Sequence, residues 1–234
     1  GGVHETRSVA SDKNAITNEL FVELALRLHD LTAGGIGPSN ISYQDWARRA
    51  WEWFRVSSLV DVETHLVLDG LSQSCVSEGS AVWTYNQGVV LGAAWRLHAA
   101  QPGDAEPLGT ALRIADAALL HLVDCQGVLR EQCEETSCDH NGQQFKGIFA
   151  THLAEFTVYL HGLGPPFAER GKAFADFLLL NAERLWESGR DVHGTGAFLA
   201  RWGGARGWQN GPNGVTHTSG MACILAAALL LRST

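Results

Sequence analysis

A short block near the middle of the chain gathers aromatic rings and side-chain amides at the start of a predicted helix. Trp83, Tyr85, Asn86 and Gln87 fall within five positions, and an ordinary helical sequence follows them. Thr84 as N-cap with Gln87 three residues later predicts a capping box, which leaves the other three residues unexplained. Rings stack on the apolar faces of sugars, and amides exchange hydrogen bonds with hydroxyl groups. The block is therefore typical of a site for a neutral, hydroxyl-rich ligand.

Two other predicted helix starts carry side chains of the same kinds. In Gln143–Phe149 (QQFKGIF), Phe145 precedes Lys146, a cation that the helix dipole disfavours near an N-terminus. Such a lysine invites a carboxylate partner in the site, and the alternative is a solvated surface lysine. Asn14 and Asn18 lie four residues apart and share one helical face. A capping role explains Asn14, whereas Asn18 sits one turn inside the helix.

The carboxylates do not form an evident catalytic pair. Hydrolysis of a glycosidic bond needs two carboxyl groups roughly 5–10 Å apart, and no Asp-Asp or similar pair opens a helix. Asp69 shares a loop with Asp61 and Glu63, and a second acidic loop holds Glu131, Glu134, Glu135 and Asp139. Because loop carboxylates are usually solvated, none is assigned a catalytic role. The histidines are scattered without metal-ligand spacing, so no metal or cofactor is expected.

Charge and cysteine content restrict the class of protein. The net charge is −8 and no basic cluster is present, which argues against a nucleic-acid surface. Five cysteines lack zinc spacing, and Cys133 and Cys138 flank a short acidic loop that a disulfide could close. Asn40 begins an N-glycosylation sequon. Together these features favour a secreted protein from an oxidising compartment. Because the number of cysteines is odd, one thiol is then expected to stay free or to pair with a group outside this chain.

The two ends of the chain suggest how it was made. The N-terminal residues include no initiator methionine and no apolar signal core, which indicates an internal piece of a longer protein or a processed chain. The longest apolar run, Met221–Leu231, is too short to span a bilayer. A buried last helix is favoured over a GPI-type tail at this position.

Helical periodicity dominates the chain and predicts an all-α fold. Apolar residues repeat at Leu20, Leu24, Leu28 and Leu31 in a helix over Asn14–Leu31 that stops at Gly34-Gly35. Ser42 opens a second helix, whose expected apolar face is Trp46, Ala50, Trp53 and Phe54. Further helices are predicted from Thr84, over Pro107–Val123, Gln144–Leu160, Pro165–Gly189 and Ser219–Leu230. The best strand candidate is His65–Leu68.

Seven helices of similar length in one domain over residues 1–234 suggest stacked helical hairpins. A toroid, a solenoid and a bundle all fit this pattern. The long connections, 58–82, 124–142 and 190–217, carry most of the unusual residues. Loops on one rim of a toroid build its site, so the chemistry is expected there.

Four blocks together resemble glycoside hydrolase family 76, the endo-α-1,6-mannanases that include fungal cell-wall enzymes. The blocks are KNAITNELF (Lys13–Phe21), HLVLDG (His65–Gly70), VWTYNQGVVLGAAWRL (Val82–Leu97) and QQFKGIF (Gln143–Phe149). The resemblance implies an (α/α)6 barrel of helical hairpins and retaining hydrolysis of α-1,6-mannan by two adjacent aspartates. In the fungal branch it implies mannan trimming, or transglycosylation that links GPI-anchored proteins to wall glucan.

Two departures from the family pattern qualify this implication. The family's Asp-Asp pair belongs to a segment before the KNAITN block, and only thirteen residues precede Asn14 here. The chain thus resembles the C-terminal part of a member, an incomplete barrel without catalytic residues that is inactive as a fragment. Members also often carry arginine where this chain has Thr151, which places substrate contacts there in doubt.

The resemblance also implies a substrate-binding set and a setting for the protein. The expected substrate-binding residues are Asn14, Asn18, Asp69, Trp83, Tyr85, Asn86, Gln87, Phe145 and Lys146. The expected partner is α-1,6-mannan or another mannose-containing wall glycan, bound by a monomer that is secreted or at the cell surface, with membrane attachment only through a GPI anchor. The competing interpretations are a non-catalytic carbohydrate-binding protein, a degenerate toroid that acts as a scaffold, and a gene product that does not fold alone.

Overall fold

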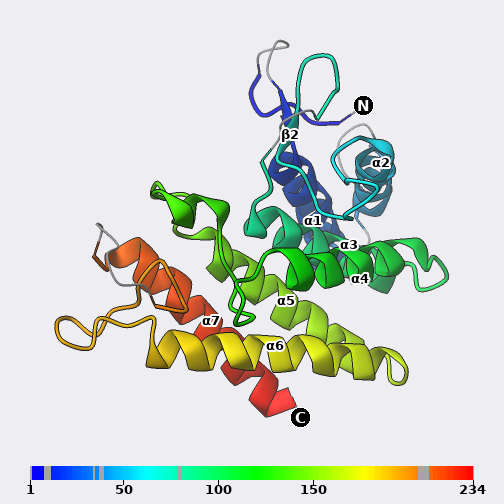
Figure 1. The fold of residues 1–234 in the computed structure, drawn as a ribbon. Helices are drawn as coiled ribbons and strands as arrows, with labels where there is room; N and C mark the ends of the chain where they lie inside the picture. The colour runs from blue at the N-terminus through cyan, green and yellow to red at the C-terminus, as the bar shows by residue number, and fades with distance from the viewer. Residues whose placement is uncertain are drawn as a thin grey trace. The chain divides into compact units, whose positions relative to one another are not determined.

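The computed structural model describes residues 2–7, 12–33, 35–36, 40–77, 81–204 and 211–233, and nearly all its regular structure is helical (Figure 1). The helices are α1 (Ala15–Leu31), α2 (Tyr43–Val56), α3 (Thr84–Ala100), α4 (Glu106–His121), α5 (Phe145–Gly162), α6 (Phe167–Glu187) and α7 (Gly214–Ser233). Two short strands, β1 (Lys13–Asn14) and β2 (Gly70–Leu71), and a 3-10 helix, Gln132–Glu135, complete the described elements. The predicted all-α class with seven helices is confirmed.

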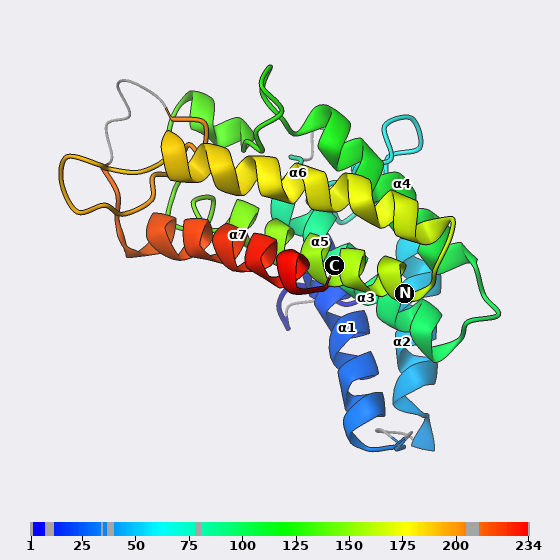
Figure 2. The same cartoon turned by 90° about the horizontal axis from the view of Figure 1, so that it is seen from below.

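The chain divides into two compact units, Gly1–Ala117 and Ala118–Thr234, with the division inside α4. In the first unit α1 packs against α2 and α3, and Figure 2 shows α1 and α2 lying side by side. In the second unit α5 packs against both α6 and α7 (Figure 2). Each unit is therefore built from neighbouring helices around one central helix.

Caps account for most of the helix boundaries. Asn14 accepts from the Thr17 amide and Ser42 from the Asp45 amide, as their positions predicted. The last helix begins at Gly214, five residues before the predicted start. Asn213 causes this difference, because its side-chain oxygen accepts from the amides of Val215 and Thr216. Of the glycine pair predicted to end α1, Gly34 lies outside the described residues.

The predicted apolar face of α1 is wrong. Leu20, Leu24 and Leu31 are 49%, 58% and 83% exposed, whereas Glu19 and Glu23 on the same helix are buried. The reason is that α1 turns polar side chains inward, where other segments bond Asn18 and pair with Glu23. Of these outward leucines, Leu24 contributes to an apolar groove of about 290 Å³, which is lined by Phe21, Leu24, Ala25, Leu28, Tyr43 and Trp46.

The predicted face of α2 is also shifted. Ala47, Trp51 and Phe54 are its buried residues, and the indole N–H of Trp51 donates to Glu106 at 2.8 Å. The other residues predicted for the buried face, Trp46, Ala50 and Trp53, are only half-buried. Of the predicted set, Phe54 alone lies fully in the core.

The HLVLDG segment is a connector rather than a strand. Val67 and Leu68 form isolated bridges, and β2 begins only at Gly70, where it pairs antiparallel with β1. In this register Asn14 faces Gly70. The pairing places Asp69 beside the start of α1, and the Asp69 carbonyl accepts from the Ala15 amide at 2.8 Å.

The last helix is longer and more exposed than predicted. Within the described residues α7 is the one helix whose length and composition suffice to cross a bilayer. Cys223 and Leu230 are buried against neighbouring helices, whereas Leu225 and Leu231 are 62% and 65% exposed. The prediction of a short, buried apolar run is therefore corrected to a full-length helix with one packed and one open face.

Candidate functional site

The backbone before Asp69 is fixed from α3. Gln87 is fully buried, its Oε1 accepts from the Val67 amide at 2.7 Å, and its Nε2 donates to the Val67 carbonyl at 2.8 Å. The same amide donates to the carbonyl of Trp83, which is the N-cap and uses no side-chain capping bond. The predicted capping box of Thr84 and Gln87 is thus wrong, because Gln87 is engaged by the neighbouring loop.

Asp69 meets two predicted site residues at the start of α3. Its Oδ1 accepts from the Tyr85 hydroxyl at 3.3 Å and from the Asn86 amide at 3.1 Å. Asp69 and Tyr85 are half-buried, and Asn86 is fully buried. The Asn86 Oδ1 has no hydrogen-bond partner among the described residues. The cluster therefore offers a half-buried carboxylate and a half-buried phenol, which hydroxyl groups can bond, beside a buried amide oxygen.

The two predicted asparagines of α1 serve the backbone. Asn14 caps the helix, and Asn18 accepts from the Val3 amide at 2.7 Å. The Asn18 amide donates to the carbonyls of Val3 and Asn14 at 3.0 and 2.8 Å. Both amide hydrogens of Asn18 are thus used to hold the N-terminal segment against α1.

A buried acid that the sequence did not indicate lies beside this cluster. Glu19 is 1% exposed, and neither carboxyl oxygen has a hydrogen-bond partner in the described part of the chain. Burial, followed by the charges of Asp69 and Glu23, raises the pKa of Glu19 well above its usual value. Burial and the charges of Asp69 and Glu19 likewise raise the pKa of Tyr85, which keeps its hydroxyl as a donor.

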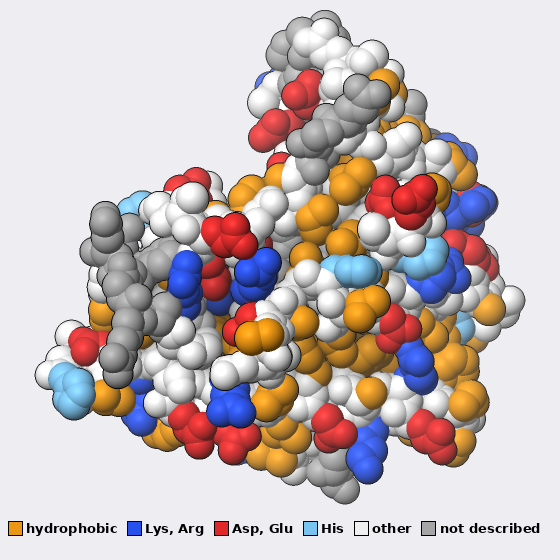
Figure 3. Space-filling model, viewed as in Figure 1, with side chains coloured by type: hydrophobic (Ala, Val, Ile, Leu, Met, Phe, Trp, Pro, Cys, Tyr) orange, Lys and Arg blue, Asp and Glu red, His pale blue; other side chains and the backbone are white. Residues whose placement is uncertain are grey.

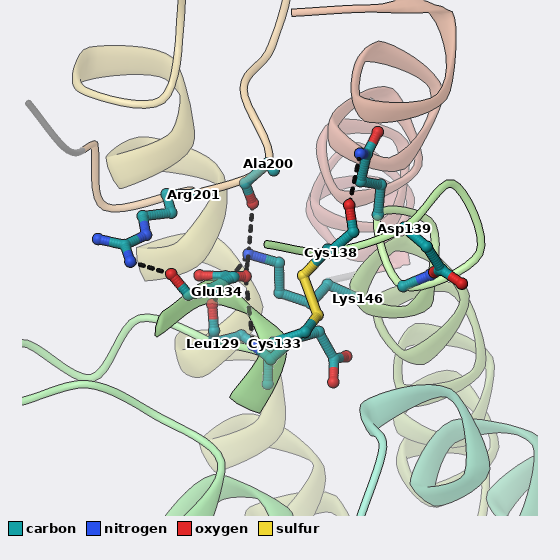
Figure 4. Close-up of a disulfide and its surroundings, with 11 residues drawn as sticks. Leu129, Cys133, Glu134, Cys138, Asp139, Lys146, Ala200 and Arg201 are labelled. Carbon is teal, nitrogen blue, oxygen red and sulfur yellow. Dashed lines mark hydrogen bonds and ion pairs between the residues drawn. A yellow bond between two sulfur atoms is a disulfide. The ribbon is translucent and has the colours of Figure 1, made fainter. Parts of the chain in front are cut away.

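Lys146 anchors the second unit instead of lying in solvent. It is 2% exposed, and its ammonium lies 2.5 Å from the Glu134 carboxylate. It also donates to the carbonyls of Ala200 and Leu129, at 2.7 and 3.4 Å (Figure 4). The ring of Trp202 covers the ammonium at 4.7 Å. Three protein oxygens thus match its three N–H groups.

The predicted carboxylate partner of Lys146 exists and is positioned by a covalent link. Cys133 and Cys138 form the expected disulfide, and Glu134 follows Cys133 directly (Figure 4). The guanidinium of Arg201 donates to the Glu134 carbonyl. The other cysteines, Cys75, Cys125 and Cys223, are free, so three thiols remain rather than the predicted one.

A cleft of about 270 Å³ opens at this ion pair. It is lined by Asp124, Val128, Leu129, Arg130, Glu134, Glu135, Arg201, Trp202, Gly203 and Gly204. In Figure 3 acidic and basic side chains alternate over the loop between α4 and α5. Phe145 is half-buried at the start of α5. Within the second unit Lys146 therefore lies behind a mixed-charge cleft.

The structure separates the predicted site residues into two groups. Asn14, Asn18, Asp69, Trp83, Tyr85, Asn86 and Gln87 belong to the first unit, and Phe145 and Lys146 to the second. Among the described residues no group of three or more histidine, cysteine or acidic side chains is placed to hold a metal ion. The Asn40 sequon is exposed at the approach to α2.

Comparison with known proteins identifies the family. A model of Glycosyl hydrolase family 76 matches residues 2–232. Mannan endo-1,6-alpha-mannosidase DCW1 of Candida glabrata is 27% identical over 83% of this chain and 42% of its own length. The chain spans less than half the length of such fungal relatives.

Solved structures agree with the family model. A GH76A α-1,6-mannanase of Salegentibacter sp. HEL1_6, inactivated at two consecutive aspartates and bound to α-1,6-mannotetrose, is 27% identical with a TM-score of 0.77. The match covers 98% of this chain and 63% of that one. Dfg5 of Chaetomium thermophilum, at 19% identity and a TM-score of 0.78, shares the fold. The expected α/α-barrel fold class is confirmed, and the chain belongs to glycosyl hydrolase family 76.

Proposed function

We propose that this chain supplies the sugar-holding part of a glycoside hydrolase or transglycosidase that acts on α-1,6-mannan with retention of configuration. The family supports the reaction class, and the relatives named for mannan endo-1,6-α-mannosidase support the substrate. The bound mannotetrose in a structural relative also supports it. The observation that carries the assignment is the carboxylate of Asp69 held between Tyr85 and Asn86.

The chemistry of this cluster suits an uncharged sugar. A mannose hydroxyl can donate to the half-buried carboxylate of Asp69. The ring of Tyr85, whose hydroxyl bonds Asp69, offers an apolar face beside this acceptor, and Trp83 remains a proposed sugar contact. Charge-assisted hydrogen bonds of this type contribute more than neutral ones, so Asp69 is expected to dominate the affinity.

Other predicted residues hold the backbone around this cluster in place. Gln87 and Asn18 fix the backbone on either side of it, because their polar atoms are bonded to main-chain groups.

In the second unit, Lys146 is assigned a positioning role, since a sugar would have to displace one of its three protein partners. Phe145 remains a proposed sugar contact.

Cleavage by the family's mechanism needs a pair of carboxyl groups. The 234 residues contain no Asp-Asp dipeptide. We therefore expect this chain to bind mannan oligosaccharides without hydrolysing them.

The setting we propose is outside the cell, at a fungal wall. The fungal relatives, the Cys133–Cys138 disulfide and the exposed Asn40 sequon support this placement. We also propose that the protein is a monomer. Light scattering of the purified chain tests this, and a single peak with the mass of the monomer is expected.

Binding of α-1,6-mannotriose, measured by calorimetry, tests the proposal. Asp69→Asn is expected to weaken binding about tenfold or more, the cost of a lost charged acceptor. Glu63→Gln is the matched control, since it removes one charge from the same connection at an exposed position. Isomaltotriose, an α-1,6-linked glucose trimer, is expected to bind more weakly.

Three results would contradict the proposal in different ways. Absence of binding to either sugar would reject the carbohydrate function. Equal affinity for the two sugars would reject the preference for mannan. Equal loss in Asp69→Asn and Glu63→Gln would remove Asp69 from the site.

A further inference from the structure

Glu19 occupies an environment that an ionised carboxylate does not tolerate. It lies in the second turn of α1, is 1% exposed, and finds no hydrogen-bond partner for either oxygen among the residues described. An ionised carboxylate in such surroundings is strongly disfavoured, and the group takes up a proton instead. The burial of Glu19 thus requires an explanation that its own contacts do not supply.

Negative charges around Glu19 add to the free-energy cost of ionising it. Asp69, from the connection before β2, and Glu23, one turn along α1, both act on it with negative charge. Glu23 is already neutralised by Arg27, at 2.7 Å, and by Arg96 of α3, at 3.4 Å. These guanidinium groups are therefore engaged by another carboxylate.

In the described part of the chain, no cation from the elements that pack against α1 bonds either oxygen of Glu19. From α3, Tyr85 faces the same acidic cluster with a hydroxyl that donates to Asp69. The ammonium of Lys13 in β1 lies over the ring of Trp53. No charged group of α2 is among those that act on Glu19 in the described residues.

We propose that Glu19, one turn along α1 from the Ala15 amide that bonds the Asp69 carbonyl, is a neutral carboxylic acid in the folded protein, so that it adds no negative charge beside the Asp69 carboxylate of the sugar site. Two neighbouring carboxyl groups avoid simultaneous ionisation, and the proton resides on the more buried one. Asp69 is the half-buried member and already accepts from Tyr85 and Asn86.

A protonated Glu19 carboxyl adds a hydrogen-bond donor to a region in which the free polar atoms are acceptors. The Asn86 Oδ1 is buried without a partner in the described chain, and Asp69 offers further lone pairs. A carboxylic acid has one O–H to give, whereas a carboxylate has none. The ligand part of this inference rests on the proposed function, and the proton part does not.

Stability as a function of pH tests the proton on Glu19. A carboxyl whose pKa is higher in the folded than in the unfolded chain contributes stability that is lost as the pH rises from about 4.3 through the folded-state value. Glu19→Gln mimics the neutral acid and removes that loss. The midpoint of urea unfolding should therefore fall with pH more steeply in the wild type than in Glu19→Gln.

A surface control and a direct measurement complete this test. Glu52→Gln, which changes an exposed carboxylate in a surface ion pair, is expected to follow the wild-type curve. Curves for the wild type and Glu19→Gln that run parallel from pH 4 to 8 would overturn the proposal. If Glu19→Gln does not fold, ¹³C NMR of glutamate-labelled wild type decides, because one glutamate carboxyl should remain protonated at pH 7.

Calorimetry with α-1,6-mannotriose tests the consequence for the site. Glu19→Gln is expected to bind within about threefold of the wild type at pH 6, whereas Asp69→Asn weakens binding about tenfold. A tenfold loss in Glu19→Gln at this pH would overturn the assignment of Glu19 as a neutral acid beside the site. If the wild type binds no mannotriose, the proposed function fails, while the pH titration still decides where the proton lies.

Discussion

Gln87 bonds both backbone groups of Val67, with distances of 2.7 Å to the amide and 2.8 Å to the carbonyl. This pair fixes the connector two residues before Asp69, so it determines where the Asp69 carboxylate meets Tyr85 and Asn86. A side-chain amide here does what a strand partner does elsewhere. The site thus depends on a buried bond that no ligand touches.

Gln87→Ala should lower the free energy of unfolding by roughly 2–4 kcal/mol, because the buried amide and carbonyl of Val67 lose their partners. Urea denaturation followed by circular dichroism measures this loss. Gln44→Ala is the control, since Gln44 is half-buried and makes one bond to the Ala100 carbonyl; its cost should be below about 1 kcal/mol. Equal losses in the two variants would contradict the role of Gln87.

Lys146→Met should destabilise the protein by roughly 3–5 kcal/mol, because the buried carboxylate of Glu134 loses its counter-charge. Combining it with Glu134→Gln should restore much of the loss, since no uncompensated charge remains. Arg55→Met removes the exposed Arg55–Glu52 pair and should cost at most about 1 kcal/mol. A double variant as unstable as Lys146→Met alone would show that packing, and not charge, sets the cost.

Gly147→Ala should destabilise the second unit by roughly 1–3 kcal/mol through overpacking. A methyl group on Gly147 would lie 2.7 Å from backbone atoms of Ser219, so α5 and α7 would have to separate. Gly109→Ala is the matched control, since its methyl group would meet only the end of Arg113 at 3.5 Å. That variant should gain up to about 1 kcal/mol from helix propensity. Thermal unfolding of both variants distinguishes the two effects, and a stabilised Gly147→Ala would contradict the close approach.

The helices could be predicted from the sequence because their period and caps are local. Asn14 and Ser42 cap helices as their sequence positions indicate. The inward face of α1 could not be predicted, because a leucine repeat normally marks the buried side. Glu23 is buried here where Arg27 and, from another helix, Arg96 pair with it, and periodicity carries no information about the partner on the other helix.

The types of residue in the site could be predicted from the sequence, but most of their bonding partners could not. The pattern around Lys146 indicated a carboxylate partner, and the structure identifies Glu134, twelve residues earlier in the chain. The sequence pattern assigned Gln87 to a helix cap, whereas in the structure its side chain bonds the backbone of Val67. Glu19 was missed altogether. Its one sequence signal is its position next to Asn18, one turn inside a helix, where an acid is as common on the surface as in a site.

Thiol labelling should distinguish the free cysteines by burial. Cys75 and Cys125 are exposed, whereas Cys223 is fully buried and its pKa is raised to about 12 by that burial. Because the thiolate is the reactive form, iodoacetamide at pH 8 should modify Cys75 and Cys125 in the native protein and leave Cys223 intact. Denaturant without reductant should expose Cys223 as a third site, and reductant should add Cys133 and Cys138. Mass spectrometry counts the adducts at each stage; native labelling of Cys223 would contradict its burial, and full labelling without reductant would contradict the disulfide.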